Sequence, residues 1–427
     1  MPAKEPLTLR RLVIRDTGKL APFNEAAREL RILNKRLWLY QRDVLAPYTR
    51  EEREISSIDA MPDDRAETIV YRDNLFFDQA FIDHFLRRAR RLGKACRVAF
   101  SPHDRAIKTH ALPLQSGIRP EKGLREGELL VADLWYFPHG RESNVRPLLV
   151  DTLAKEIGYY NVPKYMAPHQ GDLTYQVPRR AFLSIEHWIH VFLANTTFGV
   201  FAEGSRFEQR MERSMPKVKL IWRALVERNN VLSQSQVVKM GKDVRIDPSA
   251  VIRGPTTIGD NVLIGPGAVI DNSIIGSNVS IGQGCQVMLS VVGDGSFLPF
   301  RASLFMTTMM ENSMVAQNTC LQMCVVGRDS FIGAGCTFTD FNLVPRPIKT
   351  FHQDRLVEIN LPVIGGCVGH NCRLGAGFIV FPARTIESDV ILVGSRAEKV
   401  LTHNVTYADS DHLKLPDGAK LHPPHYH

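Results

Sequence analysis

From residue 244 onward an aliphatic side chain recurs every six positions, and no other feature of the sequence restricts the possible folds as strongly. The spacing holds over five positions, resumes after a slip of one residue, and returns twice more. The aliphatic positions are Ile246, Ile252, Ile258, Ile264, Ile270, Ile275, Ile281, Val287, Val326, Ile332, Phe338, Val368, Leu374, Val380, Ile386 and Leu392. A period of six fits neither an α-helix, with its period of about 3.6, nor a simple alternating strand.

This repeat predicts a left-handed parallel β-helix over residues 241–401. Each hexapeptide would form one side of a triangular coil, with the aliphatic residue inside the prism and Gly or Asn at the tight corner. Gly often follows the aliphatic residue, as at Gly259, Gly265 and Gly333. An ordinary β-sandwich is the alternative fold for this half.

Two stretches interrupt the predicted repeat. Residues 296–325 are rich in Met and Thr, and the period of six is blurred there. Residues 341–362 contain three prolines and several charges. Because insertions in solenoids fall at corners and commonly form the binding face, both stretches are predicted to lie near a ligand.

The first 206 residues have a different pattern. Runs such as ETIVYRDN (67–74), CRVAF (96–100) and ELLVADLWYF (128–137) are rich in β-branched and aromatic residues and predict strands. Between two of them, a helix is expected to begin at Asp78 and to end at Gly93. Alternating strands and helices predict an α/β domain. A long buried helix is expected over residues 181–204.

These patterns divide the chain into four predicted parts. Residues 1–206 form the α/β domain, and residues 207–240 form a helical linker broken near Pro216. Residues 241–401 form the β-helix, and residues 402–427 form a polar C-terminal tail. The tail contains several histidines, and we expect it to be frayed rather than to bind a metal ion.

The net charge of +8 at first suggests a nucleic-acid partner. However, residues 1–240 carry 39 Lys and Arg against 29 Asp and Glu, whereas the remainder carries 14 against 16. The excess therefore belongs to one half, where no nucleic-acid motif accompanies it, and no nucleic-acid partner is predicted. A basic α/β surface that suits anionic phosphates is predicted instead.

Composition bears on the class of protein and on its location. The sequence is 44% hydrophobic and 23% charged, which is typical of globular proteins. It has no apolar run of eighteen residues and no apolar segment near its N-terminus, so neither a membrane span nor a signal peptide is predicted. Seven cysteines without a signal peptide favour free thiols and a cytoplasmic location.

The β-helix half resembles the C-terminal domain of bifunctional sugar-1-phosphate nucleotidylyltransferase/N-acetyltransferases. The resemblance is carried by FIGAGCTFTDFN (331–342) and by DRLVEINLPVIGGCVGHNCRLGAGFIVFPARTI (354–386). LVIRDTGKLAPFNEAARELRILNKRLWLYQRD (12–43) is similar to the opening of divergent sugar nucleotidyltransferases. This resemblance implies a nucleotidyltransferase-like α/β domain, and a homotrimer whose ligand sites lie in clefts between β-helices.

In that family a Gly-rich loop after the first strand holds the nucleotide phosphates. The corresponding segment here is RDTGKLAPFN (15–24), which retains one Gly and one Lys. The resemblance implies nucleotide-binding roles for Lys19, Asp73 and Asn74, with Mg²⁺ accompanying a nucleotide. A degenerate domain that is kept for packing or specificity is the alternative.

Acetyl transfer in the family depends on a His that acts as general base. The resemblance places this position at Gln317, and an amide cannot act as a base. His370, at a predicted corner, is the candidate for a displaced base, with an acyl-CoA as donor. The alternative for His370 is a corner residue with a backbone hydrogen bond.

A polar pocket is predicted along the two interruptions. Its candidate substrate-binding residues are Arg301, Gln317, Asn318, Gln322, Asp340, Asn342, Arg346, Lys349 and Arg355. The Arg and Lys side chains would suit an anionic ligand. The alternative is an Asn/Gln ladder along stacked corners. No metal site is predicted, because the Cys spacings are unlike those of metal sites and a three-His zinc site would need more His than this half contains.

Three functional hypotheses follow. The first is a transferase-family protein that acts on or binds a phosphorylated or nucleotide-activated sugar in the β-helix clefts. The second is a non-catalytic scaffold or binding protein. The third is an acyl-CoA-dependent acyltransferase with a displaced base.

Overall fold

The computed structural model describes residues 9–122, 127–160, 172–211, 233, 237–344, 346–394 and 399–427. These residues form two compact units. The α/β unit comprises residues 1–18 and 26–190, and the β-helix unit comprises residues 19–25 and 191–427. The chain therefore crosses between the units three times, and the short segment 19–25 folds with the β-helix.

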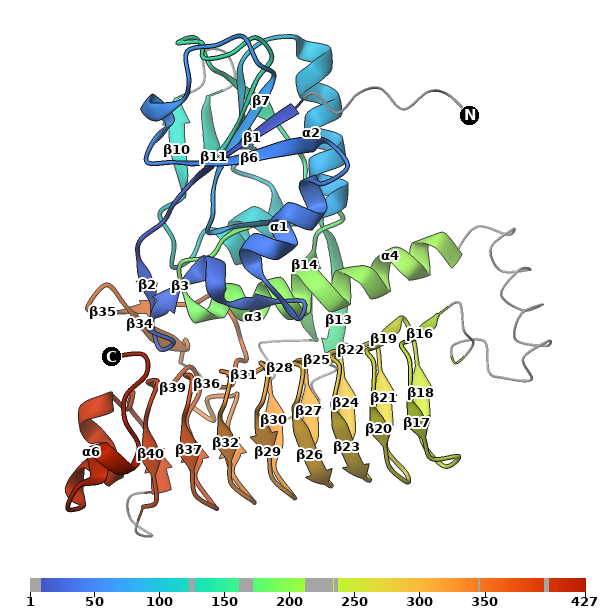
Figure 1. Cartoon of the computed structure of the whole chain (residues 1–427), viewed down its shortest axis with the longest axis vertical. Helices are drawn as coiled ribbons and strands as arrows, with labels where there is room; N and C mark the ends of the chain where they lie inside the picture. Colours follow the sequence, from blue (N-terminus) through green and yellow to red (C-terminus); the bar gives the residue numbers. More distant parts are fainter. Residues whose placement is uncertain are drawn as a thin grey trace. The chain divides into compact units, whose positions relative to one another are not determined.

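The α/β unit is built on a seven-stranded mixed sheet (Figure 1). In spatial order its strands are β12 (Arg146–Leu149), β9 (Cys96–Phe100), β11 (Glu128–Phe137), β7 (Thr68–Arg72), β1 (Leu9–Ile14) and β6 (Thr49–Ile55), and β10 (Ile118–Lys122) also pairs with β11. Strand β1 is parallel to both of its neighbours, whereas β11 is antiparallel to β7 and β9. The strands expected over residues 67–74, 96–100 and 128–137 are confirmed.

The predicted helix after Asp78 is confirmed as α2 (Gln79–Leu92). The Asp78 carboxylate accepts a hydrogen bond from the Phe81 N–H, and Gly93 ends the helix in the left-handed conformation. The buried face of α2 carries Phe81, Ile82, Phe85, Leu86 and Ala89. The unit also contains α1 (Leu37–Leu45) and small two-stranded sheets that pair β4 (Arg31–Ile32) with β5 (Lys35–Arg36), β8 (Leu75–Phe77) with β15 (Phe182–Ser184), and β13 (Lys155–Tyr160) with β14 (Leu173–Val177).

The single long helix expected over residues 181–204 is wrong in its first part. Residues Phe182–Ser184 form β15, and the helix begins only at α3 (Trp188–Asn195). A π-helical turn at Thr196–Val200 joins α3 to α4 (Phe201–Met211). Pairing of β15 with β8 outweighs local helix propensity at the start of this segment. Most of the predicted linker 207–240 lies outside the described residues.

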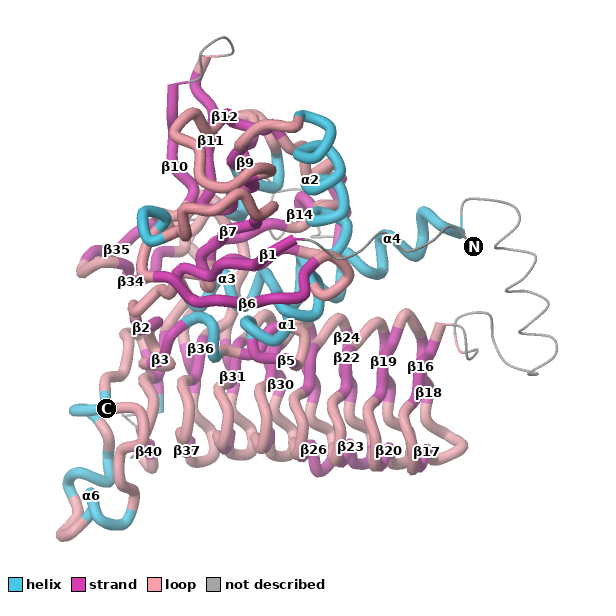
Figure 2. The backbone as a smooth tube through the Cα atoms, turned by 45° about the horizontal axis from the view of Figure 1, so that its top comes forward, coloured by secondary structure: helices cyan, strands magenta, loops and turns pink. Residues whose placement is uncertain are grey.

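The predicted left-handed β-helix is confirmed as three parallel eight-stranded sheets (Figure 2). The first sheet contains β16 (Val238–Met240), β19 (Thr256–Ile258), β22 (Ile274–Ile275), β25 (Val291–Val292), β28 (Thr308–Met309), β31 (Val325–Val326), β36 (Cys367–Val368) and β39 (Thr385–Ile386). The second contains β17 (Arg245–Ile246), β20 (Leu263–Ile264), β23 (Ser280–Gln283), β26 (Phe297–Phe300), β29 (Met314–Val315), β32 (Phe331–Ile332), β37 (Arg373–Leu374) and β40 (Ile391–Leu392). The third contains β18 (Val251–Arg253), β21 (Val269–Asp271), β24 (Gln286–Met288), β27 (Ser303–Phe305), β30 (Cys320–Gln322), β33 (Thr337–Phe338), β38 (Ile379–Val380) and β41 (Val400–Leu401).

The expected interruption at residues 296–325 is wrong. The prism continues through this stretch, and its buried interior positions are Leu298, Leu304, Met309, Val315 and Leu321. The repeat looked blurred because large apolar side chains also occupy outward and corner positions here. The second interruption is confirmed, since a hairpin of β34 (Lys349–His352) and β35 (Arg355–Glu358) projects between two coils.

The three rows of corners differ in chemistry. Between the first and second sheets, Asn and Asp adopt positive φ and form a ladder, in which the Asn312 amide donates to Asp329 (3.1 Å) and the Asn371 amide to Asp389 (2.8 Å). Between the third and first sheets, Met306 and Met323 adopt the same conformation and are buried. A left-handed conformation costs non-glycine residues roughly 1–2 kcal/mol, which burial of these side chains offsets.

Helix α4 lies over the first coils of the β-helix, near β16, β19 and β22, in both views (Figures 1 and 2). Gly204 of α4 lies so close to Asn272 that a Cβ would stand 2.4 Å from the Asn272 amide nitrogen.

The C-terminal residues are ordered, so the expected frayed tail is wrong. Residues 402–427 contain two 3₁₀ turns and the short helix α6 (Gly418–Leu421). His412 and His422 are buried, and His422 Nε2 lies 3.0 Å from the Asn371 carbonyl oxygen. Among the described residues, no helix has both the length and the apolar character needed to cross a membrane.

Candidate functional site

The carboxyl ends of β1 and β7 form the topological switch point of the α/β sheet. From β1 the chain continues to β6 on one side, and it then returns to β7 on the other side of β1. Ligands in open α/β sheets bind in the crevice outside such strand ends. Asp16 follows β1 closely, and Asp73 and Asn74 follow β7 directly. Two of the three predicted nucleotide-binding residues therefore lie at this edge.

Asp73 is buried and already has partners for both carboxylate oxygens. The Asp16 N–H donates to Oδ1 (2.8 Å), and the Arg28 guanidinium donates to Oδ2 (3.1 Å). Burial raises the pKa of Asp73, although these hydrogen bonds and the Arg28 charge oppose the rise. The Asp16 carboxylate in turn accepts the Gly18 N–H (2.9 Å). Together these bonds fix the start of the loop that follows β1.

Asp73 offers no free carboxylate oxygen to a Mg²⁺ ion. Magnesium needs carboxylate oxygens that are free to coordinate it, and the Arg28 cation occupies that position at Asp73. Within the part of the chain that the structure describes, no group of three or more His, Cys, Asp or Glu side chains could hold a metal ion. We therefore assign no role to a metal at this edge.

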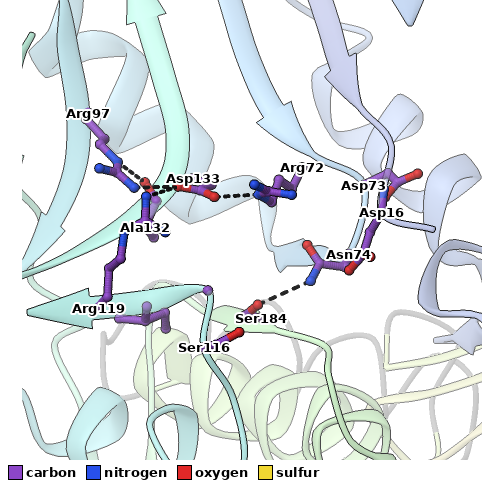
Figure 3. Close-up of polar contacts among 12 residues, drawn as sticks. Asp16, Arg72, Asp73, Asn74, Arg97, Ser116, Arg119, Ala132, Asp133 and Ser184 are labelled. Atoms are coloured by element: carbon purple, nitrogen blue, oxygen red, sulfur yellow. Dashed lines mark hydrogen bonds and ion pairs between the residues drawn. The ribbon is translucent and has the colours of Figure 1, made fainter. Parts of the chain in front are cut away.

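Three arginines surround a single buried carboxylate beside this edge (Figure 3). Asp133 of β11 is 2% exposed and contacts Arg72 Nε (2.5 Å), Arg97 and Arg119 (3.2 Å). Figure 3 shows Arg97 and Arg72 approaching Asp133 from opposite sides. Arg97 is mostly buried, whereas the side chains of Arg72 and Arg119 are 40% and 51% exposed. One negative charge thus orients three positive charges, two of which also reach solvent.

A chain of hydrogen bonds completes the polar rim of the site. The Asn74 amide lies 3.4 Å from the Ser184 hydroxyl, which donates to Glu186 (2.6 Å). Glu186 also accepts the N–H groups of Ser116 (2.7 Å) and Gly117 (2.8 Å) and the Ser116 hydroxyl. Although burial opposes the change, these hydrogen bonds lower the pKa of Glu186. Glu186 is therefore ionised and holds residues 116–117 against Ser184.

Sequence reasoning missed most of this site. Arg72, Arg119 and Asp133 lie on three strands, and their relation depends on the sheet order rather than on a local motif. The usable signal was one charged residue, Asp133, inside an otherwise apolar strand. Lys19 is exposed and belongs to the β-helix unit, whereas Asp73 and Asn74 belong to the α/β unit.

The predicted substrate-binding residues of the β-helix fall into separate groups. Arg301 and Asn318 occupy the same row of corners, between the second and third sheets, and Gln322 lies on β30. Lys349 and Arg355 lie on the hairpin, and Asn342 bonds the Arg346 carbonyl in the loop before it (3.0 Å). Gln317 precedes the corner residue Asn318, and burial raises the pKa of Asp340. The single polar pocket proposed for all of them stays a prediction.

An open groove of about 590 Å³ lies at the Arg301 corner. It is lined by Pro266, Gly267, Gln283, Gly284, Phe300 and Arg301. Gly267 has no atom within 4 Å of the position that a Cβ would occupy, so the groove is open at that corner. An exposed cation beside a half-exposed aromatic ring suits an anionic ligand that carries a flat or apolar group.

His370 lies at a corner and is fully buried. The Arg328 N–H donates to its Nδ1 (2.9 Å), so the ring proton is assigned to Nε2, which lies 3.7 Å from the Glu25 carboxylate. Burial lowers the pKa of His370, which keeps the ring neutral. A general base needs an accessible lone pair. This environment agrees with a corner residue held by a backbone hydrogen bond, and the base role stays a prediction that requires release of the ring.

Comparison with known proteins identifies a class of repeat. Residues 238–272 match the family described as bacterial transferase hexapeptide (six repeats). This match supports a transferase-type function and agrees with the three-sheet prism.

Two solved structures match part of the chain. One is a Bacillus cereus protein provisionally designated an acetyltransferase, with 17% identity and a TM-score of 0.19, covering 40% of this chain and 86% of that one. The other is the acetyltransferase domain of PglB from Neisseria gonorrhoeae in complex with acetyl coenzyme A, with 15% identity and a TM-score of 0.18. It covers 39% of this chain, and the match spans 61% of that domain's structure. No curated protein sequence matches the chain.

Proposed function

We propose that the chain is a transferase-type protein whose α/β unit binds a phosphorylated or nucleotide-linked sugar at the carboxyl edge of β1 and β7. The observation that carries this proposal is the cluster of Arg72, Arg97 and Arg119 on Asp133. Guanidinium groups bind phosphate oxygens through paired, charge-assisted hydrogen bonds. Arg72 and Arg119 are exposed enough to bind a ligand, while Asp133 holds them in place.

The neighbouring polar groups suit the rest of such a ligand. Asn74, Ser116 and Ser184 lie around the same space in Figure 3, and they supply amide and hydroxyl groups of the kind that bind sugar hydroxyls. The leading candidate site for this ligand therefore lies in the α/β unit rather than in the β-helix clefts. It needs no Gly-rich loop, because cationic side chains supply the phosphate contacts.

Ligand binding to the arginines tests this proposal directly. Calorimetric titrations with inorganic phosphate, UDP, a hexose 1-phosphate and a UDP-hexose should detect binding to the wild-type chain. Arg72→Ala and Arg119→Ala should each weaken binding about 10- to 100-fold, since a hydrogen bond to a charged group contributes about 1.5–3 kcal/mol. The matched control is Arg146→Ala on the exposed part of β12, which should bind as the wild type does. Absence of binding by the whole panel, or equal binding by all variants, would overturn the proposal.

Acyl transfer is the second candidate, and the groove at Arg301 favours it. An exposed guanidinium there suits the phosphates of an acyl-CoA, and Phe300 offers an apolar contact. Acetyl coenzyme A therefore belongs in the same panel. Binding that is lost in Arg301→Ala but kept in Arg72→Ala would favour acyl transfer, and absence of any ligand would favour the scaffold hypothesis.

We also propose that the β-helix associates with further copies of itself, as a trimer, through its second sheet. The outward residues Leu263, Ser280, Phe297, Met314 and Phe331 are in register on consecutive coils. Of these, Leu263, Phe297 and Phe331 are 52%, 41% and 37% exposed. Exposed apolar side chains that recur along one face in this way are typical of an association surface.

A charge in this column should separate the copies. Phe297→Asp and Phe331→Asp are expected to shift the sedimenting species from trimer to monomer, because a carboxylate would be desolvated at the contact. Analytical ultracentrifugation at micromolar concentration measures the change. The control is Val251→Asp, which places the same charge on the third sheet, where the residue is 40% exposed. A wild-type monomer, or trimeric aspartate variants, would contradict the proposed surface.

A further inference from the structure

Residues 19–25 follow the first strand of the α/β unit but fold with the β-helix unit. The Pro22 carbonyl accepts the Ser388 N–H (3.0 Å), and the Ser388 hydroxyl lies 3.0 Å from the same oxygen and 3.1 Å from the Phe23 carbonyl. A Cβ on Gly369 would stand 2.7 Å from the Pro22 oxygen. Only glycine therefore allows this close approach of the two backbones.

His370 organises the surface that receives this segment. Its N–H donates to the Ser388 hydroxyl (2.8 Å), and its ring packs on Phe23, with 4.9 Å between the ring centroids. Phe23 is completely buried. His370 therefore contacts Ser388 through its main-chain N–H and Phe23 through its ring.

Charged groups fasten the end of the segment. The Glu25 carboxylate pairs with Arg328, whose Nε also lies 3.8 Å from Glu311. The side chains of all three are at most 15% exposed. Burial opposes ionisation of Glu25, but His370 and Arg328 outweigh it and lower the pKa of the carboxyl. Removal of one partner of a mostly buried ion pair is strongly destabilising, because it leaves the other charge buried without a partner.

The C-terminal residues cover the same anchor. The Tyr426 ring packs on the His370 ring, with 4.8 Å between the ring centroids. The main-chain N–H of Tyr426 donates to the Asp389 carboxylate (2.8 Å). The His427 ring nitrogen lies 3.1 Å from the Asn24 amide and 3.1 Å from the Ser388 carbonyl. Residues 19–25 and the C-terminal residues therefore meet on one corner of the β-helix.

We infer that residues 19–25 form a strap, which His370, Arg328 and the C-terminal residues hold on the β-helix, and that the strap positions the loop carrying Asp16. The positioning role rests on the function proposed above. Asp16 is three residues from Lys19, so the chain keeps the two within about 11 Å of each other, and release of the strap would widen the range of positions open to the loop that carries Asp16. His370 is thus a positioning residue in this arrangement. The segment that resembles a phosphate-binding loop serves as an anchor here.

Hydrogen exchange in the full-length protein tests the strap. In His370→Ala, amides of residues 19–25 should exchange at least tenfold faster than in the wild type. His370→Asn should restore much of the protection, because its amide oxygen can accept the Arg328 N–H. Tyr426→Ala removes the cover without altering the prism and should also loosen residues 19–25, whereas Tyr426→Phe should not. The matched control is His403→Ala at an exposed position of the same C-terminal region.

Affinity for UDP separates this inference from the proposed function. A several-fold loss of affinity in His370→Ala, and its recovery in His370→Asn, would support positioning of Asp16. Unchanged exchange of residues 19–25 in both His370→Ala and Tyr426→Ala would overturn the strap. Faster exchange with unchanged UDP affinity would overturn the positioning role alone. If the wild type binds no UDP or phosphate, the proposed function fails, while the exchange data still decide whether the strap exists.

Discussion

Replacing Asp133 with alanine is expected to lower the free energy of unfolding of the α/β unit by about 3 kcal/mol, the lower end of the range for a broken buried ion pair. The carboxylate is 2% exposed and is shared by Arg72, Arg97 and Arg119. Without it, the mostly buried Arg97 loses its buried charged partner, and like charges face one another. We expect the loss of stability to lie near the lower end of this range because the side chains of Arg72 and Arg119 can turn toward water.

Chemical denaturation measures this change, and two variants control it. Asp133→Asn keeps the shape but removes the charge, so it should be destabilised nearly as much and should also weaken phosphate binding. Glu121→Ala removes an exposed partner that lies 3.5 Å from Arg97 and should change stability by less than about 0.5 kcal/mol. Equal stability of Asp133→Ala and Glu121→Ala would show that Asp133 does not hold the cluster together.

Replacing Leu321 with alanine is expected to destabilise the β-helix by about 2–5 kcal/mol. Leu321 points into the prism, is completely buried, and lies in register with Leu304 of the preceding coil. The rigid coils above and below cannot collapse into the cavity, because each is fixed by backbone pairing. Since each coil is stabilised by its neighbours, a loss of stability in one coil should also destabilise the adjacent coils.

The neighbouring residue provides the matched control. Gln322 is the next residue of the same strand and points outward. Gln322→Ala should therefore change stability by about 0.5 kcal/mol or less. Thermal denaturation followed by circular dichroism compares the two variants. If the two substitutions destabilise the protein equally, Leu321 does not point into the prism and Gln322 does not point out of it. The prism would then not continue through this stretch.

The β-helix could be predicted from the sequence because its signal is local and repeated. Every sixth side chain meets the same interior, so one periodicity describes the whole half. Helix α2 was predictable for a related reason, since Asp78 caps its own helix and Gly93 ends it within the segment. The Met-rich stretch was wrongly predicted to interrupt the repeat. Its corner residues Met306 and Met323 are apolar because they are buried in the fold, and the sequence of a single hexapeptide does not show this burial.

The candidate site could not be predicted in the same way. Asp73 and Asn74 were identified through a resemblance, but their bonds to Arg28 and Ser184 join residues more than forty positions apart. Likewise, nothing local in His370 shows that Arg328 occupies its Nδ1 or that Tyr426 covers it. The partners of a polar side chain depend on which strands become neighbours.

The sequence by itself determined the parallel β-helix, the mixed α/β domain before it, and the basic character of that domain, because repeat spacing, local propensity and charge are properties of short segments. Only the tertiary structure decided that three arginines meet on Asp133, that residues 19–25 fold with the β-helix, and that the C-terminal residues cover His370. These features arise from the order of the strands and from the crossings of the chain between the two units. Both bring residues together that are distant in the sequence, and neither produces a periodic sequence pattern.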